Sequence, residues 1–295
     1  MKVTNAFSLP ASFVKFCEDQ NKPLKNTIRV TELINPPKIR ILKRKNWKNL
    51  EIDASEQIWA LLGTSVHFIL EEYTDSKDIS EEKLKLVFPQ VEGTEITLSG
   101  RPDLLSKDGV LSDYKVTSVW SSVFGYKPEW EQQLNVYAYM YARFPKLYPK
   151  ISKLQIVAIY RDWNKNEQYR NDKYPKIPCE IVSIPKWDHK VIEKFIFDRI
   201  RIHIEAENEL PDCTDVERWE KKTTFAVKNQ GLKRALRVFD TNEEALQFIK
   251  ENINKGTLSL EERKGMSMRC KYYCNALPFC EQGRKLVEKE ETNGS

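Results

Sequence analysis

An acidic pair and a lysine are the residues of this chain whose types and spacing best suit chemistry. Asp103 follows a proline, and Asp113 comes ten residues later with Lys115 two positions beyond it. An Asp-Gly dipeptide between them predicts a hairpin turn, because it tolerates positive φ. The expected strands are residues 98–105 and 110–116, which would make the two carboxylates neighbours and put Lys115 on the face of Asp113. Such carboxylates can hold Mg²⁺ or Mn²⁺, and the lysine can orient or help deprotonate a metal-bound water that attacks a phosphodiester.

A second set of polar residues has helical spacing. Gly63, His67 and Glu71 follow at intervals of four, so they would share one helix face. Imidazole suits Mn²⁺ at least as well as Mg²⁺, and the missing side chain at Gly63 would let a backbone or a phosphate approach. The alternatives are a packed or exposed histidine and an ordinary surface glutamate. Gln133 and Tyr137 also lie one turn apart, where a core tyrosine beside an exposed glutamine is the simpler interpretation.

The cysteines give the next signal. They are Cys17, Cys179, Cys213, Cys270, Cys274 and Cys280. Clustered cysteines in a cytosolic protein of this size indicate metal ligands rather than disulfides. The spacing Cys-x3-Cys-x5-Cys of the last three differs from the Cys-x2-Cys of a usual zinc ribbon. Buried free thiols are the alternative, and Cys179, at the start of an expected strand, is predicted to be a small apolar core residue.

Composition limits the class of protein. The chain has 295 residues, 31% of them charged, with a net charge of +5. No apolar run approaches the length that spans a bilayer, and the N-terminus lacks the hydrophobic region of a signal peptide. These features predict a soluble, cytoplasmic protein. The mild basic charge is compatible with nucleic acid binding but does not establish it.

The elements that must position these residues alternate between helix and strand. Helices are expected over residues 54–73, 129–143 and 188–210, and strands over residues 154–163 and 180–184 beside the hairpin. This order predicts an α/β core with a mixed sheet flanked by helices. A ββαβ insert over residues 225–262 should follow, bringing Cys213 and Cys270 together at its base. The basic stretch 38–48 is either a solvated face or a lip that contacts phosphates.

Taken together, these motifs resemble the PD-(D/E)xK nuclease superfamily, in its RecB/AddB-like exonuclease branch, which includes RecB-like CRISPR-associated and phage nucleases. Pro102-Asp103 with Asp113-Tyr114-Lys115 resembles the signature itself. The helical His67 segment resembles the first motif of the branch, Gln133-x-x-x-Tyr137 its helical motif, and the last three cysteines its cluster. The resemblance covers roughly residues 28–283 and implies a restriction-endonuclease-like core.

The resemblance implies roles for these residues. His67, Asp103 and Asp113 would bind one or two Mg²⁺ or Mn²⁺ ions, and Lys115 would position the water. Gln133 would contact the site or the DNA backbone; Tyr137 would hydrogen-bond a phosphate or stack on a base. A further carboxylate from Glu92 or Glu95 would complete the set.

For the cysteines the resemblance implies a structural [4Fe-4S] cluster, which needs four thiolates. Asn35 stands where the family often has its N-terminal ligand. Cys213 is the first candidate for the fourth ligand beside Cys270, Cys274 and Cys280, and Cys17 is the second. Zinc is the alternative metal.

The expected function is that of a metal-dependent DNA exonuclease of phage or mobile-element type, acting in DNA processing or recombination on a DNA end or a single-stranded stretch. A structure-specific endonuclease, or a nuclease-fold DNA-binding protein without catalysis, is the alternative. Recombination or replication proteins are possible partners, in the bacterial cytoplasm if the gene is phage-borne. The expected division is an N-terminal arm (1–27), a nuclease core (28–212), the insert with the cysteine segment (213–287) and a polar tail (288–295).

Overall fold

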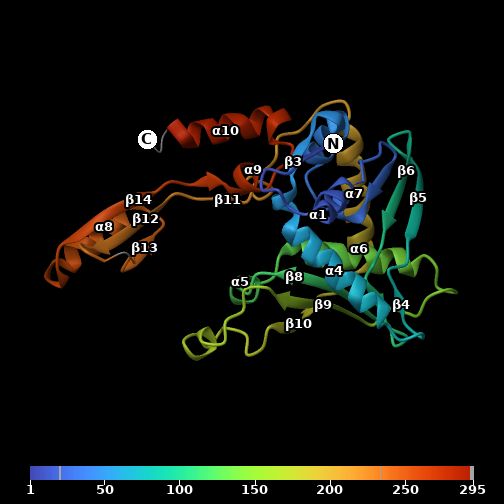
Figure 1. Cartoon of the computed structure of the whole chain (residues 1–295), viewed down its shortest axis with the longest axis horizontal. Coiled ribbons are helices and arrows are strands. Elements are labelled where there is room, and N and C mark those ends of the chain that lie inside the picture. Colours follow the sequence, from blue (N-terminus) through green and yellow to red (C-terminus); the bar gives the residue numbers. More distant parts are fainter. Residues whose placement is uncertain (20, 233, 293–295) are drawn as a thin grey trace. The chain divides into compact units, whose positions relative to one another are not determined.

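The computed structural model describes residues 1–19, 21–232 and 234–292. The chain divides into two compact units, Met1–Pro211 and Asp212–Ser295. Both mix helices with sheets, so the protein is of the α/β kind (Figure 1). No described helix is both long and apolar enough to cross a bilayer.

The first unit is built around a mixed sheet of five strands, in the order β10-β9-β8-β7-β4. The bounds are β4 Ile79–Ser80, β7 Leu104–Leu105, β8 Val110–Thr117, β9 Lys153–Tyr160 and β10 Cys179–Ile184. Strands β8 and β9 run parallel, and the other pairs are antiparallel. The predicted apolar strand is thus β9, in which every second residue is buried. The sheet places β8, with its acidic and basic side chains, beside this strand.

A second sheet of three strands, β2-β6-β5, lies in the same unit. Its strands are β2 Thr27–Arg29, β5 Leu84–Val91 and β6 Thr94–Gly100. Ile28, Leu84, Phe88, Ile96 and Leu98 point into the core and are buried. The alternate residues form the other face, because successive strand side chains point to opposite sides.

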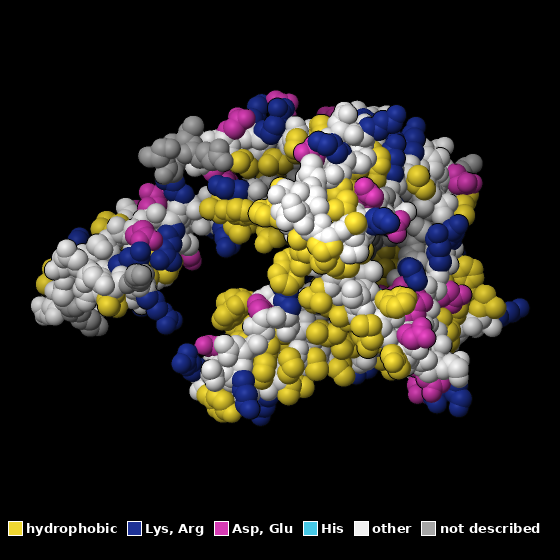
Figure 2. Space-filling model, in the orientation of Figure 1, with side chains coloured by type: hydrophobic (Ala, Val, Ile, Leu, Met, Phe, Trp, Pro, Cys, Tyr) yellow, Lys and Arg dark blue, Asp and Glu magenta, His cyan; other side chains and the backbone are white. Residues whose placement is uncertain are grey.

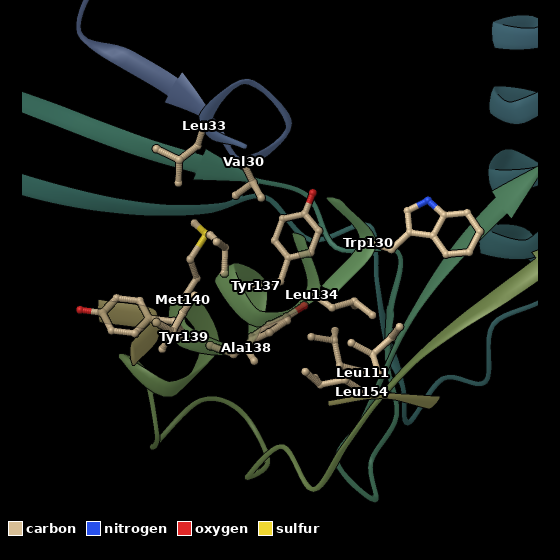
Figure 3. Packing of buried hydrophobic residues seen from close by; sticks show 14 of the residues in the cluster. Val30, Leu33, Leu111, Trp130, Leu134, Tyr137, Ala138, Tyr139, Met140 and Leu154 are labelled. Carbon is tan, nitrogen blue, oxygen red and sulfur yellow. The ribbon is translucent and has the colours of Figure 1, made fainter. Parts of the chain in front are cut away.

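Helix α6, Pro128–Ala142, is the centre of the core, and it begins with a proline at its first turn, where no backbone donor is lost. Figure 3 shows Leu134 of α6 beside Leu111 and Leu154 of the five-stranded sheet, and Tyr137 beside Val30. Helices α2, Val30–Leu33, and α7, His189–Glu205, also pack on α6. Burial of both sheets against one helix fixes where the residues of α6 point.

The N-terminal segment, expected as an arm over residues 1–27, forms a strand and a helix within this unit. Strand β1, Lys2–Thr4, pairs in parallel with β3, Glu51–Asp53. Helix α1, Ala11–Glu18, buries Cys17. The Asp53 carboxylate accepts hydrogen bonds from the backbone of Ala6 and of Ser55, which ties the segment down.

Helix α4, Ile58–Glu72, follows the short helix η2, Ala54–Gln57, as the sequence predicts. None of its residues is fully buried. Trp59, Phe68 and Ile69 are more than half exposed, and Figure 2 shows hydrophobic side chains gathered over this helix. Helix α4 therefore lies on the surface of the first unit and leaves several of its apolar side chains unburied.

Three expectations for the first unit are wrong. The predicted strand 98–105 is broken, because β6 ends at Gly100 in one sheet and β7 starts at Leu104 in another; Pro102, which has no N–H, lies between them. Lys38 and Arg40, expected in a solvated face or a lip, are 7% and 4% exposed. The Arg40 guanidinium pairs with glutamates 32 and 207 instead. Cys179 is exposed rather than part of the core.

The remaining elements of this unit are short. They are α3 Pro37–Lys45, η1 Trp47–Asn49, α5 Trp120–Val123 and η3 Glu167–Tyr169.

The second unit contains the predicted ββαβ arrangement. Strands β12 Thr224–Asn229, β13 Arg237–Phe239 and β14 Leu258–Arg263 form a sheet in the order β13-β12-β14, and α8 Asn242–Glu251 packs on it. A two-stranded ladder pairs β11 Glu220–Lys221 with β15 Met266–Ser267. The rest are η4 Ile253–Lys255, α9 Met268–Tyr272, η5 Leu277–Phe279 and α10 Glu281–Thr292. The expected polar tail is therefore helical as far as Thr292; residues 293–295 lie outside the described part.

Candidate active site

The acidic residue and the lysine of β8 form an ion pair at the middle of the five-stranded sheet. Asp113 and Lys115 are two positions apart on one strand and share a face, as predicted. Lys115 Nζ lies 2.6 Å from Asp113 Oδ2. Asp113 is 1% exposed, and this burial raises its pKa to about 6, against the opposing charge of Lys115. A buried carboxylate with one cation beside it thus lies on the central strand.

Asp103 lies just before β7, across from Asp113. Leu104 pairs with Ser112, and extending this antiparallel register by one residue places Asp103 opposite Asp113. The backbone N–H of Tyr114 donates to Asp103 Oδ2 at 2.6 Å. This bond leaves the other carboxylate oxygen, Oδ1, directed at a histidine.

That histidine is His67 of α4. Its Nδ1 lies 3.2 Å from Asp103 Oδ1 and 3.4 Å from Glu81 Oε1. Its Nε2 lies 3.1 Å from the carbonyl oxygen of Tyr114, and a carbonyl can only accept. Nε2 therefore donates to this carbonyl in either protonation state, while Nδ1 donates to the carboxylates when the ring is charged and offers a lone pair once that proton is lost. Hydrogen bonds to Asp103 and then Glu81 raise the pKa of His67 to about 10.

Glu81 was not anticipated from the sequence. It adopts φ +50, a left-handed conformation that is uncommon outside glycine. Arg101 Nε donates to the Glu81 carbonyl oxygen at 2.9 Å and lies 2.8 Å from its Oε2. Glu92 and Glu95, the two carboxylates expected here, are exposed near the β5–β6 turn. No sequence signal marks Glu81, since its position depends on a two-residue strand and an unusual backbone angle.

His67, Glu81 and Asp103 together can hold a divalent cation. Within the described chain, one ligand atom from each lies within 4.8 Å of the others. Two carboxylates and an imidazole are donors that suit Mn²⁺ and Mg²⁺. A histidine whose other N–H is fixed by a backbone carbonyl is also typical of a metal ligand. Asp113 Oδ2 is buried beside the Lys115 ammonium, so this oxygen is already in contact with a cation.

Gln133 and Tyr137 of α6 hold Asp113 from the core side. Gln133 Nε2 donates to Asp113 Oδ1 at 3.0 Å and to the Tyr137 hydroxyl at 3.3 Å. The Tyr137 side chain is 4% exposed, and burial raises the pKa of its hydroxyl. This burial leaves its ring no open face for a base.

Two residues of the first sequence motif lie apart from this group. Glu71 is 3.7 Å from Arg101, so it contacts the site only through that side chain. A Cβ built on Gly63 meets no atom within 4 Å. No close packing within the chain therefore requires glycine at this position.

The second unit contains four of the six cysteines. Gln282, at the start of α10, accepts from the Cys213 N–H and donates to its carbonyl, both at 2.9 Å. These two bonds hold the backbone of Cys213 against the start of α10, the helix that follows Cys280. Burial, followed by the nearby Cys274 and Cys280, raises the pKa of Cys270 to about 11. Among the described residues, three of these sulfurs do not come together as the ligand atoms of His67, Glu81 and Asp103 do. Cys17 lies in the first unit, buried, with its Sγ 3.9 Å from the Ala54 carbonyl.

Comparisons with known proteins give weak likenesses. No family model matches this sequence, and no curated protein matches it. Among solved structures, the protein SSO0001 is similar at 19% identity, over 64% of this chain and 82% of its own, with a TM-score of 0.45. An alkaline exonuclease from Laribacter hongkongensis is similar at 14% identity, over 63% of this chain and 91% of its own, with a TM-score of 0.30. The same exonuclease in complex with dAMP is similar at 14% identity, over 63% of this chain and 90% of its own, with a TM-score of 0.35.

Proposed function

We propose that the first unit is a metal-dependent deoxyribonuclease of the PD-(D/E)xK type. The main support for the proposal is that two groups of polar side chains, from separate parts of the chain, lie next to each other. One is the His67–Glu81–Asp103 donor set, and the other is the Asp113–Lys115 ion pair. Tyr114 joins them, since its N–H binds Asp103 and its carbonyl binds His67.

The chemistry would be hydrolysis of a phosphodiester. When bound, a divalent ion lowers the pKa of a coordinated water and offsets charge on the phosphate. Lys115, 24% exposed at its side chain, can hold the attacking water by a charged hydrogen bond. The water oxygen bonds to phosphorus as the bond to the leaving sugar oxygen breaks; the water gives up a proton to solvent, and the leaving oxygen takes one up from solvent. Gln133 and Tyr137 are positioning residues that keep Asp113 and Lys115 in place.

The finer assignment, exonuclease of the RecB/AddB-like branch, rests on the motif resemblance, and a role in phage or mobile-element DNA processing goes with it. A structure-specific endonuclease would use the same residues. End-labelled linear DNA and covalently closed circular DNA of one sequence, each incubated with Mg²⁺, Mn²⁺ or EDTA, test both levels. We expect metal-dependent loss of the linear DNA with the circle intact. Cleavage of the circle would favour the endonuclease. No cleavage of either DNA with any metal would exclude the nuclease.

We further propose that Cys213, Cys270, Cys274 and Cys280 bind a metal centre in the second unit, an iron–sulfur cluster rather than zinc. The support for a metal centre is the small apolar core there, and the preference for iron–sulfur rests on the motif resemblance. Among its described residues, the buried apolar ones are Ala226, Val227, Ala245, Ala276 and Cys280. Small units that lack a core often depend on a metal for stability. Anaerobically purified protein should contain iron and sulfide; about one zinc per chain would change the metal, and neither metal would exclude the centre.

A further inference from the structure

A groove beside the metal-binding group has the character of a binding surface for an anionic chain. Its volume is about 1090 Å³, at the upper end of the roughly 300–1,000 Å³ typical of ligand pockets. Five basic residues line it, which we call the basic groove: Lys22, Arg29, Lys83, Lys85 and Arg101. Among the described residues that line it, the acidic one is Glu81 of the proposed metal-binding group.

The three-stranded sheet forms the floor of the basic groove. Lys85 of β5 pairs with Ser99 of β6, which pairs with Arg29 of β2. Val87 likewise pairs with Thr97. Paired residues share a face, so this row lies opposite the buried Leu84 and Leu98 side of the sheet. The groove is therefore the face of the sheet that does not pack on the core.

The lysines of the groove have free charges. Lys83 and Lys85 are exposed and make no hydrogen bond or ion pair with any described residue. They are two residues apart, roughly 6.6 Å along the strand, which is on the scale of adjacent phosphates in an extended polynucleotide. Arg29 is partly engaged, since it donates to the carbonyls of residues 21 and 22. The lysines are thus the groups that remain for phosphates.

Two exposed aliphatic side chains favour a single strand over a duplex. Leu24 and Val87 line the groove and are each 57% exposed. Apolar side chains at a basic groove can contact the faces of unpaired bases, whereas a duplex keeps its bases stacked and paired. A groove of this volume also has room for a short single-stranded segment.

We propose that the basic groove binds single-stranded DNA and directs it to the metal-binding group. Glu81 lines the groove and belongs to the metal-binding group, and Arg101 of the groove pairs with it, so a strand bound by Lys83 and Lys85 would lie next to the proposed cleavage position. This inference rests on the proposed nuclease function for its purpose, but the binding itself does not depend on cleavage.

Binding can be measured without cleavage by using EDTA and a fluorescein-labelled oligothymidylate. The double variant Lys83→Ala, Lys85→Ala is compared with the control Lys107→Ala, Lys153→Ala, which removes two exposed lysines elsewhere in the first unit. We expect the groove variant to bind about ten-fold more weakly at low salt. The slope of log K against log salt should flatten by about 1.4, because each phosphate contact on a single strand contributes about 0.7. The control should keep the affinity and slope of the wild type.

The outcomes separate this inference from the nuclease proposal. If the groove variant binds like the control while the wild type cleaves DNA, the groove assignment is wrong and the nuclease stands. If the groove variant alone loses binding but no form of the protein cleaves, the groove stands and the nuclease fails. A blunt duplex and heparin are the competing ligands. Equal loss of affinity for heparin, or loss for the duplex alone, would overturn the assignment to a single strand.

Discussion

Among the candidate active-site residues, Glu81 is held by several contacts to its backbone and its side chain. Its N–H donates to the Asp103 carbonyl at 3.2 Å, and Arg101 holds both its carbonyl and its carboxylate. A non-glycine residue with positive φ costs on the order of 1–3 kcal/mol and persists only where its surroundings determine it. These contacts therefore favour a role for Glu81 as a metal ligand over that of an ordinary surface carboxylate.

Glu81→Gln should weaken Mn²⁺ binding by at least about ten-fold, because the variant keeps the size of the side chain but loses the anionic ligand. Free Mn²⁺ measured by electron paramagnetic resonance during a titration gives the affinity directly. Glu95→Gln, at an exposed position near the β5–β6 turn, is the matched control. Equal Mn²⁺ affinity in the two variants would remove Glu81 from the ligand set.

Lys115→Ala should reduce cleavage by about 10²–10³-fold, the usual cost of removing one preorganised hydrogen-bond donor from a reacting site. It also removes the cation that lowers the pKa of Asp113, so this buried carboxyl would be protonated more readily. Far-ultraviolet circular dichroism should stay unchanged. A folded variant with normal metal-dependent activity would show that Lys115 is only an ion-pair partner.

At the scale of elements, the local sequence pattern predicts the helices and strands whose burial follows from their own sequence. Helix α6 and strands β8 and β9 lie where their periodicity predicts them, and so does the ββαβ order. The DxK pair follows from β8 alone. What could not be predicted depends on contacts distant in sequence: the transfer of the chain between two sheets at Pro102, and the approach of Glu81 to His67. The burial of Arg40 has the same cause, since its partner Glu207 comes from α7's C-terminal side, far along the chain.

Gly100, the last residue of β6, tests how tightly α6 is held under the site. A Cβ at this position would lie 2.6 Å from Tyr137 Cε1 and 3.0 Å from Val30 Cγ2. Gly100→Ala should destabilise the protein by about 1–3 kcal/mol, as overpacking of a core does. Gly63→Ala is the contrasting variant, because nothing lies within 4 Å and alanine favours the helix by about 0.5–1 kcal/mol. Urea unfolding gives both values; equal stability of the two variants would contradict the packing described.

For the whole molecule, stability should depend on pH through His203. This residue of α7 is 1% exposed, and its Nε2 lies 3.3 Å from the Leu33 carbonyl. Burial, followed by Arg199 and Arg40, lowers its pKa to about 3. An unfolded histidine has a pKa near 6.5. Between these values the unfolded chain binds a proton that the folded chain does not, so stability falls as pH falls through this window.

The expected loss from this one group is up to about 1.4 kcal/mol per pH unit below about pH 6.5. His203→Gln, whose amide can still donate to the Leu33 carbonyl, should reduce the slope of unfolding free energy against pH by that amount. His189→Gln, on the exposed first residue of the same helix, should leave the slope unchanged. If the His203 variant keeps the slope of the wild type, the buried ring does not control this dependence.

The folding stability of the second unit should depend strongly on its cysteines. Three aliphatic side chains in or next to that sheet and its helix remain exposed: Leu236, Val238 and Leu246 are each more than 40% accessible. Metal–thiolate bonds would then supply folding free energy, for which structural zinc sites give about 10–16 kcal/mol as an upper guide. Because the pKa of Cys270 is raised to about 11, binding must release protons and should strengthen as pH rises. Cys270→Ser should therefore make α9 and α10 sensitive to trypsin, while exposed Cys179→Ser should not. Equal resistance of both variants would mean that hydrophobic packing alone holds this unit together.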